Sequence, residues 1–142
     1  MSTTTRGVER GRGIERVESS RGFDQTVEHF EKLLADRGMT VFAKIDFTSD
    51  AKKSGLEMPR TLLLVFGNPK GGTPVMVAAP SSALDLPLKV LIANDTGGKA
   101  WLSYNTPEYL AERHDIPADL VKNIAGIRLL VQTAAARGAA NA

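Results

Sequence analysis

The chain has 142 residues, enough for one domain with a single hydrophobic core. Hydrophobic residues make up 42% of the sequence and charged residues 24%, as is typical of a globular protein. The sequence contains no cysteine, which excludes disulfides, thiolate metal sites and a cysteine nucleophile.

The net charge of +2 is concentrated at the N-terminus. Residues 1–22 hold five Arg and three Glu, whereas the remaining residues carry 13 basic and 13 acidic side chains. A basic face extending over the whole domain is therefore not expected, and neither is binding to nucleic acid. No stretch approaches 18 consecutive apolar residues, and the polar N-terminus lacks the apolar core of a secretory signal. We expect no membrane span and, by elimination, a cytoplasmic location.

The first half of the chain predicts a tail followed by alternating strands and helices. The expected elements are a disordered tail over 1–12, a short edge strand over 14–20, a helix from about 24 to 37, a half-buried strand over 39–47 and a short helix over 48–54. The first helix is indicated by the spacing of Val27, Phe30 and Leu34, and Gly38 stands where a helix commonly ends.

The second half predicts two hairpins and two helices. The expected elements are strands over 61–66 and 74–79, strands over 86–93 and 99–104, a helix to about 113 and a long helix after 117. Gly71-Gly72 favours a hairpin turn between the first two strands. Thr106-Pro107 is typical of a helix start, since a hydroxyl can cap the helix and proline fits its first turn.

Short connections between most strands favour an α+β fold. We expect a curved, mainly antiparallel sheet of five to six strands, a first helix after strand one, and a long C-terminal helix packed on one face. We predict a single domain over 13–134 and a frayed C-terminus over 135–142.

Three segments dense in turn-forming, amide and charged residues match no standard catalytic or cofactor motif. They are Phe66–Pro74, Leu84–Lys89 and Tyr104–His114. Through these segments the chain resembles family 302 of the domains of unknown function, over roughly residues 13–134. The resemblance implies a small α+β fold with a curved antiparallel sheet on a long C-terminal helix, and homodimers. It implies no established activity.

The segments suggest a binding site for a small polar or anionic molecule. The candidate ligand-binding residues are Asn68, Lys70, Lys89, Tyr104 and Asn105. Glycines allow close approach to the backbone and lysine supplies positive charge. The alternative is structural: Phe66–Pro74 forms a constrained turn in which Asn68 bonds to the backbone.

Asp85 and His114 are the candidates for acid–base catalysis. Each has an alternative interpretation, Asp85 as a capping carboxylate or a partner of Lys89, and His114 as a favourable charge at a helix end. No set of metal ligands with suitable spacing is found, so no metal is expected, and the sequence identifies no cofactor.

Three hypotheses remain open at this point. The chain is a small-molecule- or anion-binding accessory domain, a metal-independent enzyme that uses Asp85 or His114, or a structural or protein-interaction module without a pocket.

Overall fold

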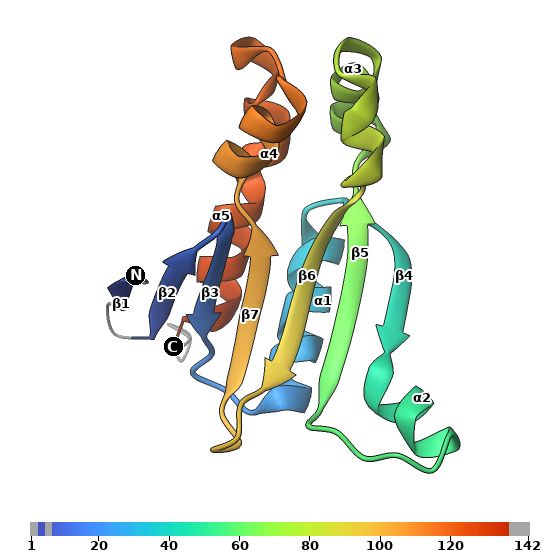
Figure 1. Ribbon diagram of the computed structural model, residues 1–142, viewed down its shortest axis with the longest axis vertical. Coiled ribbons are helices and arrows are strands. Elements are labelled where there is room, and N and C mark those ends of the chain that lie inside the picture. The colour runs from blue at the N-terminus through green and yellow to red at the C-terminus, as the bar shows by residue number, and fades with distance from the viewer. Residues whose placement is uncertain (1–2, 5–6, 137–142) are drawn as a thin grey trace.

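The structure, a computed structural model, describes residues 3–4 and 7–136. Within them, seven strands form one antiparallel sheet with the order β1-β2-β3-β7-β6-β5-β4 (Figure 1). The strands are β1 Thr3–Thr4, β2 Val8–Gly11, β3 Ile14–Glu18, β4 Thr40–Asp46, β5 Thr61–Gly67, β6 Leu88–Asn94 and β7 Ala100–Asn105. The helices are α1 Phe23–Asp36, α2 Phe47–Lys53, α3 Pro69–Ala78, α4 Pro107–His114 and α5 Lys122–Ala135, with short 3-10 helices η1 Pro80–Leu84 and η2 Ala118–Leu120. The predicted α+β class is confirmed.

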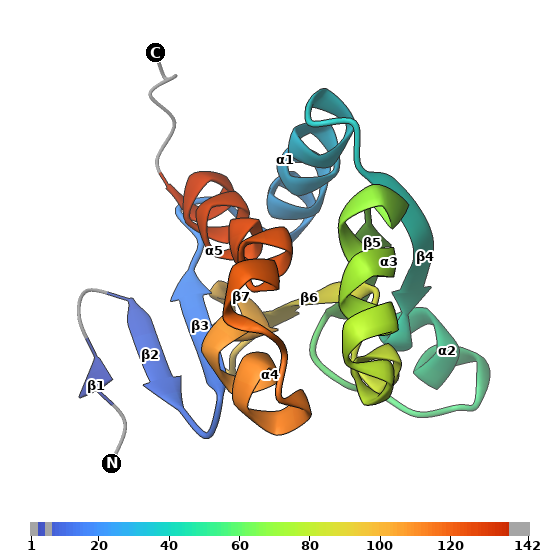
Figure 2. The same cartoon turned by 90° about the horizontal axis from the view of Figure 1, so that it is seen from above.

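The core lies between one face of the sheet and helices α1 and α5 (Figure 2). In β5 the buried side chains alternate with half-buried ones, so that Leu62, Leu64 and Phe66 point toward the helices. Phe30 of α1 meets Phe66 edge to face, with 5.5 Å between the ring centroids. Both rings are fully buried, and together they fix α1 against the end of β5 that leads to α3.

The opposite face of the sheet is left uncovered by α1 and α5 (Figure 2). Leu63 and Val65 of β5 and Leu91 of β6 are half-buried there, and Leu63 lies directly opposite Leu91. Toward β3, the Arg16 guanidinium lies 3.9 Å from the centre of the Trp101 ring. This face is therefore apolar in the middle of the sheet and carries a shielded aromatic ring toward β3.

The β5–β6 connection contains helix α3, and the predicted strand over 74–79 with its hairpin at Gly71-Gly72 is wrong. The Asn68 side chain accepts a hydrogen bond from the Lys70 amide at 3.0 Å, and Pro69 occupies the first turn. These two residues start the helix. The Asn123 amide of α5 donates to the Gly71 carbonyl at 3.0 Å and holds α3 against α5. Capping and this tertiary contact outweigh the poor helix propensity of glycine and proline here.

Strand β2 lies within the segment predicted as a disordered tail over 1–12. It pairs with β3 along its length, since the charged side chains of the two strands find partners. Arg16 donates to Glu9 at 2.7 Å, and Arg10 forms an ion pair with the buried Glu15. Residues 1–2 and 5–6 of that tail lie outside the described residues, as do 137–142 of the predicted frayed end.

The predicted hairpin between the strands now labelled β6 and β7 is confirmed, and Asp95 organises its turn. Its carboxylate accepts hydrogen bonds from the amides of Gly97 and Lys99 and, at 2.9 Å, from the Trp101 indole. The indole hydrogen bond, followed by that from Lys99, holds the pKa of Asp95 below its ordinary value.

The predicted start of α4 is also confirmed, because the Thr106 hydroxyl accepts a hydrogen bond from the Tyr109 amide.

A cluster of charged side chains attaches α4 and α5 to β3 and β7. The buried Glu15 accepts a short hydrogen bond from the Tyr104 hydroxyl, and Arg128 approaches the same carboxylate at 3.5 Å. Burial raises the pKa of Glu15, but hydrogen bonds from Tyr104 and Arg10 and the two arginine charges outweigh it, so the pKa lies below its ordinary value. Arg128 also binds Glu108 through two bonds of 2.9 and 2.8 Å, and these lower the pKa of Glu108 to about 2.

The two-bond ion pair between Arg128 and Glu108 predicts that part of the domain's stability is lost in acid. Because the folded-state pKa of Glu108 is about 2 against an ordinary 4.5, its stabilisation is present above pH 4.5 and is lost as the pH falls toward 2. Glu108→Gln should reduce the change in unfolding free energy over this range, measured by urea unfolding at successive pH values. At pH 7 the cost should stay below about 1 kcal/mol, since the Glu108 side chain is largely exposed and solvent screens the pair. Glu112→Gln, on the exposed side of the same helix, is the control and should leave the pH dependence unchanged.

The β2–β3 turn predicts a second stability effect. Gly13 has φ of 77°, and a Cβ atom added there would collide with the Tyr109 ring. Gly13→Ala should destabilise the domain by at least about 1 kcal/mol, as judged by the midpoint of urea unfolding. Gly11→Ala, where a Cβ would meet no atom within 4 Å, is the matched control. Equal stabilities of the two variants would contradict this account of the turn.

Candidate functional site

A cavity of about 180 Å³ lies where β4, β5, α3, β6 and α5 meet. Most of its lining residues come from the first two segments singled out in the sequence. The lining residues are Met39, Phe42, Gly67, Asn68, Pro69, Gly72, Thr73, Met76, Leu86, Pro87, Leu88, Asn123 and Ile124. The walls are therefore mainly apolar, with a small number of amide and hydroxyl groups among them.

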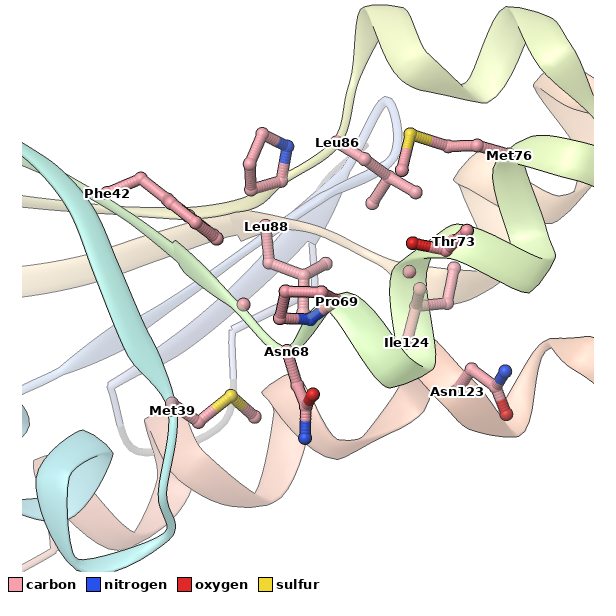
Figure 3. Close-up of a pocket in the computed structure, with 13 residues that line it drawn as sticks. Met39, Phe42, Asn68, Pro69, Thr73, Met76, Leu86, Leu88, Asn123 and Ile124 are labelled. Atoms are coloured by element: carbon pink, nitrogen blue, oxygen red, sulfur yellow. The ribbon is translucent and has the colours of Figure 1, made fainter.

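Figure 3 shows how the side chains surround this cavity. Phe42 and Leu88 lie on the strand side, and Met76 and Leu86 lie toward α3 and the approach to β6. Thr73 turns its hydroxyl toward Leu88 from the first turns of α3. An apolar enclosure with a small number of directed polar groups is the usual form of a small-molecule site.

Three features of the fold produce this cavity. Gly67 lies between Phe42 and Pro87, and a side chain at this position would point toward both. Because glycine has none, the space between them stays open. Asn68 and Pro69 turn the chain abruptly into α3, so the helix begins beside the strand end instead of extending past it. Phe42 is half exposed on the edge strand β4, at a break in the register with β5, and forms the wall nearest to solvent.

The structure distributes the predicted ligand-binding residues over different places. Asn68 lines the cavity, although its side-chain oxygen is engaged as the cap of α3. Lys70 is exposed on α3 and is not part of the lining. The Lys89 ammonium group donates to the carbonyls of Asp85 and Pro87, each at 3.1 Å, and so supports the cavity wall from behind.

The other two predicted ligand-binding residues lie at the β3–β7 side of the sheet. Tyr104 is bound to Glu15 in the charged cluster, and burial followed by the contact with Glu15 raises its pKa. Asn105 is exposed at the end of β7, opposite Ile14. Neither residue lines the cavity.

Asp85 and His114, the two candidates for acid–base chemistry, are in direct contact. The His114 Nε2 atom lies 2.5 Å from Asp85 Oδ2, which also accepts a bond of 2.9 Å from Arg113. The second imidazole nitrogen, Nδ1, lies 2.8 Å from the Ser81 hydroxyl oxygen. Sequence reasoning missed Ser81, because no standard nucleophile motif surrounds it and only the fold of η1 brings it to His114.

The segment Tyr104–His114 thus contacts the segment Leu84–Lys89 through the His114–Asp85 hydrogen bond. The segments Phe66–Pro74 and Leu84–Lys89 contribute most of the cavity lining. Within residues 3–4 and 7–136 no group of three or more His, Cys, Asp or Glu side chains is arranged to hold a metal ion. None of the helices described there combines the length and hydrophobicity needed to cross a bilayer.

Comparison with known proteins gives relatives of two kinds. The chain is 39% identical over 104 residues to proteins named fluoride-specific ion channel FluC 1 from Brucella suis and from Brucella abortus. The match covers 73% of this chain but only 41% and 38% of those two proteins. The chain therefore spans about two fifths of the length of these curated relatives.

A solved structure supports the fold independently. An uncharacterised conserved DUF302 protein from Bacillus stearothermophilus superimposes with a TM-score of 0.73 at 20% sequence identity, covering 88% of this chain and 97% of that one. The family model for the domain of unknown function DUF302 matches residues 15–132, which include most of the core, the cavity and the Ser81–His114–Asp85 contact. The chain belongs to the DUF302 family.

Proposed function

We propose that this domain is a cytoplasmic accessory domain that binds a compact, largely apolar small molecule carrying one polar group. The cavity at the start of α3 is the observation on which this proposal rests. Its walls come from segments distant in sequence, and glycine at position 67 keeps space open that a side chain would reduce. Thr73 lines the cavity beside the amides of Asn68 and Asn123, which also cap α3 and hold it against α5. Polar groups among apolar walls are typical of a small-molecule site.

The volume limits the size of the ligand. A buried apolar cavity of roughly 150 Å³ accommodates benzene, whereas sites for drug-sized ligands begin at about 300 Å³. The present cavity, at about 180 Å³, therefore suits a body of about one ring or a short branched chain. Thr73 and Asn123 would bond to a hydroxyl or carbonyl group on such a body.

The charge around the cavity favours a neutral molecule over an anion. Lys70 is not in the lining, and Lys89 is occupied by two backbone carbonyls. No charged side chain is among the lining residues. Of the two classes considered from the sequence, the apolar small molecule is thus the better match, and the anion is the competing outcome of the test.

A cavity-filling substitution tests the proposal. Phenol, indole, cyclohexanol, phosphate and fluoride would each be titrated while the melting temperature is followed. A ligand that binds only the folded state and is present at about 100 times its Kd adds about 2.7 kcal/mol of stability, which raises the melting temperature by several degrees. We expect such a shift from at least one of the neutral ring compounds. Met76→Trp should abolish it, because the indole would occupy the cavity.

Val77→Trp is the matched control, since it adds the same side chain one position along α3 at a site that is 76% exposed and outside the lining. It should keep the shift. Shifts produced by phosphate or fluoride alone would favour an anion site instead. The absence of a shift with every compound, together with an unchanged melt for Met76→Trp, would favour a structural or interaction module.

We further propose that two chains associate through the uncovered face of the sheet. Leu63, Val65 and Leu91 form the apolar middle of that face, and a second copy would bury all three. Stable interfaces bury roughly 800 Å² on each partner, so the contact would extend beyond these three side chains to the polar residues around them. Such an interface leaves the cavity on the helix side of the sheet accessible.

Charge placed on this face should separate the two chains. Leu63→Lys and Leu91→Lys are each expected to shift the protein from dimer to monomer, measured by light scattering coupled to size-exclusion chromatography. Leu129→Lys, at an exposed apolar position of α5, should leave the mass unchanged. A wild-type chain that is monomeric at all concentrations, or dissociation caused by Leu129→Lys instead, would contradict the proposed interface.

An accessory role is compatible with the partial match to the Brucella proteins. Those proteins are more than twice as long as the matched part, and their name describes a fluoride channel. We propose that the matched part contributes ligand binding next to the function that the name describes. The titration with fluoride separates this from direct recognition of the ion by the domain.

A further inference from the structure

We infer that Ser81, His114 and Asp85 form a second site, separate from the cavity, in which Ser81 is an activated nucleophile for acyl transfer. The Ser81 oxygen lies 2.8 Å from His114 Nδ1, and His114 Nε2 lies 2.5 Å from Asp85 Oδ2. The hydroxyl, the imidazole and the carboxylate are thus joined in one line of hydrogen bonds. A serine next to a base that is itself oriented by a carboxylate is the arrangement from which activated serines are recognised, independently of fold.

The three groups differ in exposure in the way that this chemistry requires. The His114 side chain is 3% exposed and that of Asp85 is 16% exposed, so the base and its carboxylate are fixed inside the protein. Ser81, in contrast, is exposed on η1, where a substrate can reach it. Arg113 holds Asp85 Oδ2 from a second direction at 2.9 Å, and Lys89 holds the Asp85 carbonyl at 3.1 Å.

The hydrogen bonds assign a role to each group. A carboxylate can only accept, so in the neutral imidazole the Nε2 hydrogen is the one donated to Asp85, and the lone pair of Nδ1 is then directed at the Ser81 hydroxyl. Asp85 is a positioning residue, because it acts on the substrate only through His114. The two imidazole nitrogens have exchanged the roles they hold in the familiar serine proteases, and both can act as a base.

The reaction with an ester then proceeds in two balanced steps. The Ser81 oxygen bonds to the acyl carbon, its proton passes to His114 Nδ1, and the ester C–O bond breaks as that proton transfers to the departing alcohol. Water next attacks the acyl carbon, loses its proton to His114, and releases the carboxylic acid as the Ser81 oxygen recovers that proton. No metal or redox partner takes part in either step.

Exposed apolar side chains on η1 and at the end of α3 indicate the class of substrate. Leu84 follows Ser81 by three residues in η1, and side chains at this spacing in a 3-10 helix lie on the same face. Leu84 is 74% exposed, and Val77, on the last turn of α3, is 76% exposed. A small ester or activated acyl group with an aliphatic chain would find apolar contacts there. Because this surface is open, we expect slow turnover and ready acylation rather than rapid catalysis.

Covalent labelling tests the nucleophile directly. An alkyl fluorophosphonate transfers its phosphoryl group to an activated serine, forming a P–O bond as the P–F bond breaks and fluoride leaves. We expect a single addition in the intact mass, located at Ser81 by peptide sequencing, and none in Ser81→Ala. His114→Gln should slow the labelling by at least about a hundredfold, the usual contribution of a positioned base. Ser49 and Ser54, both exposed, are internal controls in the same molecule.

A second variant keeps the test valid if substitution of the buried His114 unfolds the protein. The sequence has no cysteine, so Ser81→Cys would carry a single thiol. An imidazole beside it should hold the thiol partly ionised, and iodoacetamide should modify it about tenfold faster at pH 7 than the thiol of Ser54→Cys. Equal labelling of Ser81, Ser49 and Ser54 by the fluorophosphonate, or equal alkylation rates of the two cysteine variants, would overturn the inference.

Discussion

The packing of one sheet face against α1 and α5 is the contact on which the rest of the structure depends. Leu62, Leu64 and Phe66 take part in it from β5, and the alternation along the strand allows only one register. A shift by one residue would turn all three toward solvent, so the register is strongly determined. The same register places the end of β5 beside Pro87 and the start of α3, and so determines where the cavity forms.

The segment from Asp85 to Leu88 connects the two candidate sites. Leu86, Pro87 and Leu88 form one wall of the cavity, while the Asp85 carboxylate faces away toward His114 and Arg113. The Lys89 ammonium group holds the backbone carbonyls of this segment in place. Because Lys89, Arg113 and His114 hold this segment in place, it presents apolar side chains to the cavity and the Asp85 carboxylate to His114.

The sequence was most informative where a local signal and the tertiary fold agree. The start of α4 at Thr106-Pro107 and the β6–β7 turn at Asp95 follow from capping and turn chemistry alone. The Asn68-Pro69 pair carries the same kind of helix-start signal, but Gly71-Gly72 and Pro74 suggested a hairpin instead. The decisive contact there is the hydrogen bond from Asn123 to the Gly71 carbonyl. It joins residues far apart in the chain, so no pattern in the sequence around Gly71 could predict it. Ser81 became visible for the same reason only in three dimensions, whereas Asp85 and His114 could be singled out as chemical types.

Arg16 and Asp95 together determine what the chain's only tryptophan can report. The guanidinium covers the Trp101 ring and the carboxylate binds its indole nitrogen, so the ring belongs to the sheet face turned away from α1 and α5. Intrinsic fluorescence of this protein is therefore an optical probe of that face. A ligand that enters beside α3 would leave the emission spectrum almost unchanged. A partner that binds to this sheet face and displaces Arg16 would shift the emission maximum.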